Sequence, residues 1–358
     1  MREETVLVTG GTGYIAAFCI AALLRENYAV RTTIRSLDRA DEAREHISRA
    51  GADLASADLT FVEANLLSDD GWAAAMADCI YVLHVASPLT LEPPKDPDLV
   101  IRPAVEGTLR VLRFARDAGV RRVVMTSSSS AITNLAVMPG RMMDEHDWSD
   151  PTIPDTSPYV QSKTLAERAA WDFIRREGEG MELATILPVG VVGPVVGAQL
   201  NGTSELVRQI IEGKLAGMPN IEIGLVDVRD VADLHLLAMT SPKALGERFA
   251  ASTGRAVSVK ELDEVLLSVP GAAIRKPLPI VPNWVMRVLA LVQPQCSEVV
   301  QYLKRPLSVS NEKATTLLGW NPRSPHDALY QAGESIVAHT RRVKAEASKV
   351  HTVGQAGS

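Results

Sequence analysis

A glycine-rich turn between an apolar strand and a helix opens the chain, and it constrains the fold more than any other feature. Residues 5–9 are apolar and β-branched, and residues 15–25 carry a helical apolar pattern. Gly10 and Gly13 lie between them in G-x-x-G spacing, and a second predicted strand covers residues 29–34. Such glycines let the backbone turn tightly and approach a pyrophosphate at the helix N-terminus. A tight turn without a ligand is the alternative, but the strand before it and the helix after it favour dinucleotide binding. The predicted cofactor contacts in this unit are Gly10, Gly13, Tyr14 and Ile15.

The residues after the second strand indicate which dinucleotide is bound. An acidic side chain there would pair with a ribose 2′-hydroxyl, whereas arginine accommodates a 2′-phosphate. This chain has Arg35 at the strand end and Arg39 four residues later. Asp38 is the counter-argument, although it can instead cap the following helix. Because guanidinium matches phosphate bidentately, the pattern predicts NADPH over NADH, with an ordinary solvated surface charge as the alternative for Arg35.

Strand and helix patterns alternate along most of the chain, which is typical of a parallel sheet. The fold class predicted is α/β, a Rossmann-type doubly wound parallel sheet with a smaller C-terminal α/β substrate lobe. Residues 1–194, with returning segments near 221–251, would form the NADPH-binding domain. Residues 195–342 would form mainly the substrate-binding lobe, and residues 343–358 a flexible tail. Further strands are predicted at residues 59–63, 80–85, 123–126 and 181–187.

Ligands of such sheets lie beyond the carboxyl ends of the strands. Asn65 and Leu66 follow the third predicted strand, and Ala86 and Ser87 follow the fourth. We therefore expect these four residues to contact adenine and ribose. Pro188 and Val191, on the segment that leads out of the sheet after the sixth strand, are expected beside the nicotinamide.

A tyrosine and a lysine four residues apart provide the candidate chemistry. Tyr159 and Lys163 fall in a predicted helix over residues 158–177, so they share one face. An isolated phenol has a pKa near ~10, and a neighbouring ammonium favours the phenolate. Ser128, at the end of the fifth strand, can hydrogen-bond a substrate carbonyl while the tyrosine delivers a proton. Taken alone, the serine run at 127–130 would be interpreted as a flexible loop.

Composition excludes several other functional classes. The 358-residue chain has a net charge of −6, which gives no reason to expect nucleic acid or an anionic membrane as a partner. Its three cysteines (Cys19, Cys79 and Cys296) are scattered, which favours a reducing, cytoplasmic location. The seven histidines show no metal-ligand spacing, so no metal site is predicted, and His84 is interpreted as buried and hydrogen-bonded. We expect a monomer or homodimer with a small-molecule carbonyl substrate.

Six ordered motifs resemble the extended short-chain dehydrogenases/reductases, in particular the dihydroflavonol 4-reductase, cinnamoyl-CoA reductase and methylglyoxal reductase-like group. They are residues 9–15 (TGGTGYI), 84–88 (HVASP), 102–108 (RPAVEGT), 126–128 (TSS), 159–167 (YVQSKTLAE) and 226–232 (VDVRDVA). The resemblance implies NADPH-dependent reduction of an aldehyde or ketone to an alcohol, reversible in principle, with transfer of the pro-S hydride.

The family roles transfer to this chain position by position. The resemblance implies that Tyr159 is the general acid and that Ser128 holds the carbonyl oxygen. It further implies that Lys163 binds the nicotinamide ribose and that Arg35 and Arg39 bind the 2′-phosphate.

Four features depart from the family pattern. Ser129 and Ser130 replace the usual small residues after the catalytic serine, so either could also face the substrate. Asn65 replaces the usual aspartate, and an amide can still pair with adenine. The position that contacts polyphenol hydroxyls falls near Thr133 or Asn134, which gives no support for a flavonoid substrate. The Asn-Trp-Tyr-Cys-Tyr segment of cinnamoyl-CoA reductases is absent, which argues against an acyl-CoA thioester.

Two alternative functions remain on the same sequence. An NAD-dependent sugar-nucleotide epimerase or dehydratase would retain NAD+, and Arg35 disfavours it because those enzymes prefer an acidic residue there. A non-catalytic NADPH-sensing protein is disfavoured by the intact Ser128, Tyr159 and Lys163 set.

Overall fold

The structure is a computed structural model of the 358-residue chain. It describes residues 4–88, 96–133, 141–153, 156–197, 200, 202–274, 276–292, 299–300, 303 and 308–356, with side chains as far as residue 343. Asn134 and Cys296, named above, lie outside the described residues.

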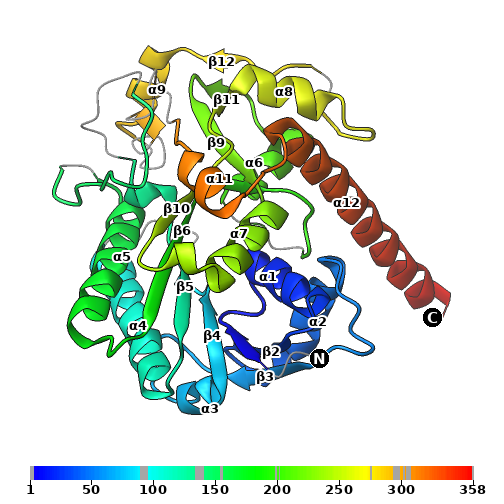
Figure 1. The fold of residues 1–358 in the computed structure, drawn as a ribbon. Helices are drawn as coiled ribbons and strands as arrows, with labels where there is room; N and C mark the ends of the chain where they lie inside the picture. The colour runs from blue at the N-terminus through cyan, green and yellow to red at the C-terminus, as the bar shows by residue number, and fades with distance from the viewer. Residues whose placement is uncertain are drawn as a thin grey trace.

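A seven-stranded sheet, parallel throughout, forms the centre of the molecule (Figure 1). Its strand order is β10-β6-β5-β4-β1-β2-β3. The strands are β1 (Thr5–Val8), β2 (Ala29–Ile34), β3 (Leu59–Glu63), β4 (Cys79–His84), β5 (Arg122–Thr126), β6 (Glu182–Pro188) and β10 (Arg248–Ala251). The chain runs outward in one direction from β1 to β3 and in the other from β4 onward. Such a reversal opens a crevice at the carboxyl ends of β1 and β4.

Helices cover both faces of this sheet, as expected for a doubly wound fold (Figure 1). One layer contains α1 (Tyr14–Arg25), α2 (Ala40–Arg49) and α7 (Val228–Thr240), and the other contains α3 (Trp72–Met76), α4 (Asp98–Asp117) and α5 (Pro158–Glu177). Short 3₁₀ turns, η1 (Leu37–Arg39), η2 (Ser129–Ala131) and η3 (Pro242–Ala244), follow β2, β5 and α7.

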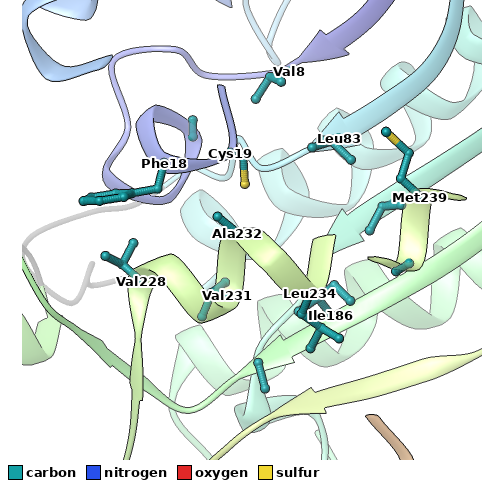
Figure 2. Packing of buried hydrophobic residues seen from close by; sticks show 14 of the residues in the cluster. Val8, Phe18, Cys19, Leu83, Ile186, Val228, Val231, Ala232, Leu234 and Met239 are labelled. Atoms are coloured by element: carbon teal, nitrogen blue, oxygen red, sulfur yellow. The ribbon is translucent and has the colours of Figure 1, made fainter. Parts of the chain in front are cut away.

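The alternation of side chains along β1 explains the two layers. Val6 and Val8 join the apolar cluster with α1 and α7, whereas Leu7 joins the cluster with α4 and α5. Figure 2 shows the first cluster, where Phe18 and Cys19 of α1 lie close to Val231 and its neighbours on α7. Burial on both faces accounts for the nearly continuous apolar strands in the sequence.

A smaller lobe follows the sheet. Its three-stranded sheet has the order β11-β9-β7, with β7 parallel and β11 antiparallel to β9. The elements of this lobe and the C-terminal region are β7 (Gly190–Val192), α6 (Gly202–Ile211), β8 (Met218–Pro219), β9 (Glu222–Asp227), β11 (Ala256–Ser258), α8 (Val259–Leu267), β12 (Ile280–Val281), α9 (Asn283–Leu289), α11 (Glu312–Leu318) and α12 (Pro325–Ala356). A third apolar cluster, with Val207, Leu262 and Ile336 among its members, joins α6, α8 and α12.

The predicted fold class is confirmed, and the differences lie in the second half of the chain. Of the segment 221–251, α7 and β10 return to the large sheet, whereas β9 belongs to the small one. α12 continues as helix to Ala356, past position 343, where a flexible tail is predicted. The short helix α9 carries Trp284, whose side chain is 69% exposed. No helix in the described part of the chain combines the length and apolarity needed to cross a bilayer.

Candidate functional site

The glycine turn has the geometry that close approach of a ligand requires. Gly10 has a φ of +77°, and a Cβ there would lie 3.1 Å from the Cβ of Ala86. The amide of Gly13 donates to the Gly10 carbonyl at 2.8 Å, which closes the turn. α1 begins at Tyr14 with neither a side-chain cap nor an acidic residue in its first turn. Its first amides and positive dipole end are therefore left for an anion.

The side chain of Tyr14 is turned into the protein rather than toward a ligand. Its ring packs edge to face on Phe18, with centroids 5.7 Å apart. The phenol oxygen is buried, and burial together with the charge of Asp227 raises the pKa of Tyr14 far above its ordinary value. Tyr14 and Ile15 can thus contribute backbone amides at the start of α1, whereas the Tyr14 hydroxyl belongs to the junction with α7.

The two predicted phosphate-binding arginines differ in their surroundings. Arg35 is exposed at the end of β2 and has no ion-pair partner among the described residues. Arg39 donates to both carboxylate oxygens of Glu42, at 2.8 and 2.9 Å. This bond to Arg39 holds the pKa of Glu42 below its usual range. Leu37 lies between the two arginines, and its amide donates to Glu63 at 3.2 Å.

The loop after β3 is fixed by its own polar groups. Asn65 Oδ1 accepts from the amide of Leu67 at 3.1 Å, and the indole of Trp72 donates to the Asn65 carbonyl at 3.0 Å. The amide nitrogen of the exposed Asn65 side chain is left as a donor. Leu66 is held from the other side because Gly107 brings α4 so close that a Cβ there would lie 3.0 Å from the Leu66 Cβ.

A small hollow brings distant predicted residues together beside α5. Its lining contains Leu66, His84, Ala86, Ser87, Pro88, Ala104, Thr108, Met125, Thr126, Lys163 and Ala166. Four of the predicted site residues therefore meet at the carboxyl ends of β3, β4 and β5. They come from three segments of the chain and are Leu66, Ala86, Ser87 and Lys163.

Tyr159 and Lys163 lie one turn apart on α5. The helix begins with Pro158 and is capped by the Ser157 hydroxyl, which accepts from the Val160 amide at 3.3 Å. Tyr159 is 40% exposed, whereas Lys163 is only 8% exposed. Within the described residues the Lys163 ammonium has neither a hydrogen-bond nor an ion-pair partner, although it lines the hollow. A nearly buried cation of this kind calls for polar groups from a ligand.

Ser128 is held where β5 passes into η2, the turn against which α5 packs. Its Oγ accepts from the amide of Ser130 at 3.1 Å, so its own O–H is free to donate. Ser129 lies inside η2, and only Ser128 has this capping position.

Pro188 and Val191 lie on the way out of the large sheet. Pro188 is buried at the end of β6, and the amide of the following Val189 donates to Ala251 at 3.1 Å. Val191 lies in β7, and its carbonyl accepts from Ser204 at 3.3 Å.

Two buried histidines support the site, and only one of them was anticipated. Thr9 Oγ1 lies 3.0 Å from His84 Nδ1 and accepts from the Ala86 amide at 2.9 Å, so the predicted burial of His84 is confirmed. Burial, with a contribution from Lys163, lowers the pKa of His84 to about 3.

His235 of α7 was not singled out by sequence reasoning. Its Nδ1 lies 2.7 Å from the Val231 carbonyl, which only accepts, so Nδ1 carries the proton. Nε2 then accepts from the Thr126 hydroxyl at 2.7 Å. Burial lowers the pKa of His235 to about 4, so both histidines are neutral near pH 7.

No group of three or more His, Cys, Asp or Glu side chains within the described ranges is arranged to hold a metal ion. In the polar cluster at residues 144–147, the exposed His146 ring lies 3.1 Å from a carboxylate oxygen of Asp144.

Known proteins resemble this chain in both sequence and fold. The model of the NAD dependent epimerase/dehydratase family matches residues 6–251. Cinnamoyl-CoA reductase 1 of Petunia hybrida is 32% identical over 336 residues, which are 93% of this chain and 92% of the relative. An anthocyanidin reductase of Vitis vinifera is 30% identical over 279 residues, 74% of this chain and 80% of the relative. The crystal structure of yeast methylglyoxal/isovaleraldehyde reductase Gre2 complexed with NADPH has a TM-score of 0.77 and 25% identity, and covers 94% of this chain and 99% of that one.

Proposed function

This chain belongs to the NAD dependent epimerase/dehydratase family, the extended short-chain dehydrogenases/reductases, and we propose that it reduces an aldehyde or ketone to an alcohol with NADPH. The observation that carries the proposal is the pair on α5. The exposed phenol of Tyr159 lies one turn from the nearly buried ammonium of Lys163, which has no hydrogen-bond or ion-pair partner among the residues that the structure describes. Several proteins that this chain resembles are reductases, and the crystal structure of one of them contains NADPH.

The residues of the glycine turn fit a dinucleotide. The uncapped start of α1 offers amides to the pyrophosphate, and Gly10 leaves the space that a side chain would fill. Asn65, with its oxygen already bonded to Leu67, presents an amide donor that suits an acceptor nitrogen of adenine. Leu66 and Ala86 border the ribose in this proposal.

Arg35 and Arg39 provide the preference for a 2′-phosphate. Arg35 is the stronger contributor because none of the described carboxylates lies within ion-pair distance of its guanidinium, and Glu42 acts on it only at longer range. Arg39 must share its donors with Glu42. Two guanidiniums beside the ribose favour NADPH and disfavour NADH.

In the reaction proposed, Lys163 hydrogen-bonds the hydroxyls of the nicotinamide ribose, and its positive charge lies one helical turn from the Tyr159 phenol. NADPH, when bound, supplies the pro-S hydride of its nicotinamide C4 to the carbonyl carbon, a choice that the family resemblance implies. Tyr159 gives its proton to the carbonyl oxygen, and the free O–H of Ser128 stabilises the charge that develops there. Pro188 and Val191 would border the nicotinamide.

A carbonyl panel tests the proposal. Purified protein is mixed with NADPH and, separately, with aldehydes, α-keto esters and aryl ketones, and both NADPH absorbance and the alcohol product are followed. Consumption of NADPH with a matching amount of alcohol is expected for at least one compound class. If no alcohol forms and the denatured protein instead releases NAD+, the epimerase or dehydratase alternative replaces the proposal.

A further inference from the structure

Glu167 is a fully buried carboxylate on the same face of α5 as the reactive pair. It follows Lys163 by four residues and Tyr159 by eight, so the three side chains lie along one line of the helix. Its exposed fraction is 0%. A charge buried so completely needs partners at every oxygen lone pair.

Four groups from different elements meet at this carboxylate. The Ser127 hydroxyl donates to Oε2 at 2.7 Å, and the Thr185 hydroxyl of β6 donates to Oε1 at 2.8 Å. Arg248 of β10 donates to Oε1 at 2.8 Å and to Oε2 at 3.1 Å. Trp171, one turn further along α5, adds a donor to Oε1 at 3.3 Å.

Two of these partners, Ser127 and Arg248, connect the carboxylate to Ser128, the first directly and the second through a loop. Ser127 is its chain neighbour, and the amide of Ser127 donates to Ile186 at 2.7 Å, so both backbone and side chain of Ser127 are fixed. Arg248 also holds the loop carbonyls of Glu145 and Asp147, at 2.6 and 2.9 Å.

That loop continues to the far side of η2. Ser149 donates its hydroxyl to the Ser130 carbonyl at 2.6 Å, and its amide donates to Ala131 at 2.8 Å. The turn that Ser128 caps, η2, is therefore held on one side by Ser127 and on the other by the loop that contains Ser149. Ser127 bonds to Glu167 itself, and the loop is joined to Glu167 through Arg248.

We infer that Glu167 is a positioning residue that sets Ser128 in register with Tyr159 and Lys163 through the Ser127 hydroxyl. The inference rests on the proposed reductase function and assigns Glu167 no contact with substrate. α5 advances ~1.5 Å per residue, so loss of its anchor to Ser127 lets Tyr159 shift against Ser128 by a fraction of one step. Misplacement by about 1 Å can lower a rate about 100-fold.

A matched pair of variants separates positioning from general stability. Ser127→Ala and Thr185→Val each delete one hydroxyl donor to the same buried carboxylate, but only Ser127 precedes Ser128. Ser127→Ala is expected to lower kcat roughly 10-fold, with the NADPH Kd changed by no more than about twofold, because the glycine turn is untouched. Thr185→Val is expected to keep kcat within about twofold.

Glu167→Gln would leave Arg248 buried without its counter-ion, so folding of this variant is at risk. The double variant Glu167→Gln with Arg248→Met removes both charges. We expect the double variant to bind NADPH and to have a kcat below that of the wild type. A wild-type kcat in this variant would overturn the inference.

Hydrogen exchange provides a reading that does not need turnover. Amides at the start of α5, residues 159–163, should exchange faster in Ser127→Ala than in Thr185→Val. Equal kcat values and equal exchange in the two variants would overturn the positioning role while leaving the proposed function intact. If the wild-type protein reduced no carbonyl, the proposed function would be refuted. The hydrogen-exchange comparison would still test separately whether the bond from Ser127 to Glu167 fixes the start of α5.

Discussion

The exposed guanidinium of Arg35 gives a quantitative prediction about cofactor choice. A charge-assisted hydrogen bond contributes about 1.5–3 kcal/mol, and solvent exposure at the end of β2 places this one near the lower limit. Since 1.4 kcal/mol corresponds to a factor of ten, Arg35→Met should lower kcat/KM for NADPH roughly 10-fold. The value for NADH should change by no more than about threefold, because NADH has no 2′-phosphate.

Arg39 provides an internal comparison for this prediction. Its two bonds to Glu42 must be shared with the phosphate, so Arg39→Met should cost less, about threefold for NADPH. Arg35→Asp should reverse the preference, because the new carboxylate repels phosphate and can accept from a ribose 2′-hydroxyl.

Steady-state kinetics with both cofactors measures these ratios. Arg44→Met is the control, since Arg44 lies on the neighbouring α2, over the ring of Phe61 at 4.8 Å, and carries the same charge. An unchanged NADPH-to-NADH ratio in Arg35→Met would refute the phosphate assignment. The same would follow if Arg44→Met lowered the ratio equally.

Three further perturbations are expected to have distinct effects. Lys163→Met should raise the NADPH KM and lower kcat at least about 10-fold, measured by initial rates, and a wild-type pH-rate profile would contradict the role of its charge. Gly10→Ala, at a φ of +77° and against Ala86, should weaken NADPH binding in a fluorescence titration roughly 10-fold or more, and unaltered binding would contradict the turn assignment. Because burial lowers the pKa of His235 to about 4, against ~6.5 in the unfolded chain, this group stabilises the protein fully above pH 6.5 and loses that contribution as pH falls toward 4. Unfolding by urea should therefore show about 2 kcal/mol less stability from this group at pH 5 than at pH 7. His235→Asn should reduce the measured loss by that amount and leave the similar contribution of His84, whereas an equal loss in the variant would refute the linkage.

Local patterns predicted the part of the fold that depends on short stretches of chain. The glycine turn and β3 have the predicted residues, and α5 runs over 158–177 as the sequence indicates. These elements are specified by apolar periodicity, a proline at the first helical position and glycines at fixed spacing. The small sheet was harder to predict, because β7, β9 and β11 are short and their pairing partners lie up to 36 residues apart.

In the candidate site, too, the residues that share one short stretch of chain were predicted, and the contacts between distant stretches were not. The sequence places Tyr159 and Lys163 together because one helix carries both. It could not predict the inward turn of Tyr14, which depends on Asp227 and α7 more than 200 residues later. The partner of His235 is equally remote, since Thr126 reaches it across 109 positions. Such contacts come from tertiary packing and leave no local pattern in the sequence.

Glu167 is an intermediate case. Its spacing from Lys163 predicts a position on the reactive face of α5, but only the structure reveals that Ser127, Thr185 and Arg248 converge on it.

Proton delivery by Tyr159 is tested most directly by Tyr159→Phe, which removes one hydroxyl and keeps the ring. The variant should bind NADPH with an affinity within about threefold of wild type, because the glycine turn and Lys163 are unchanged. In a single turnover with bound NADPH and a carbonyl that the wild type reduces, its oxidation rate should fall at least about 1,000-fold. A rate within tenfold of wild type would contradict the account.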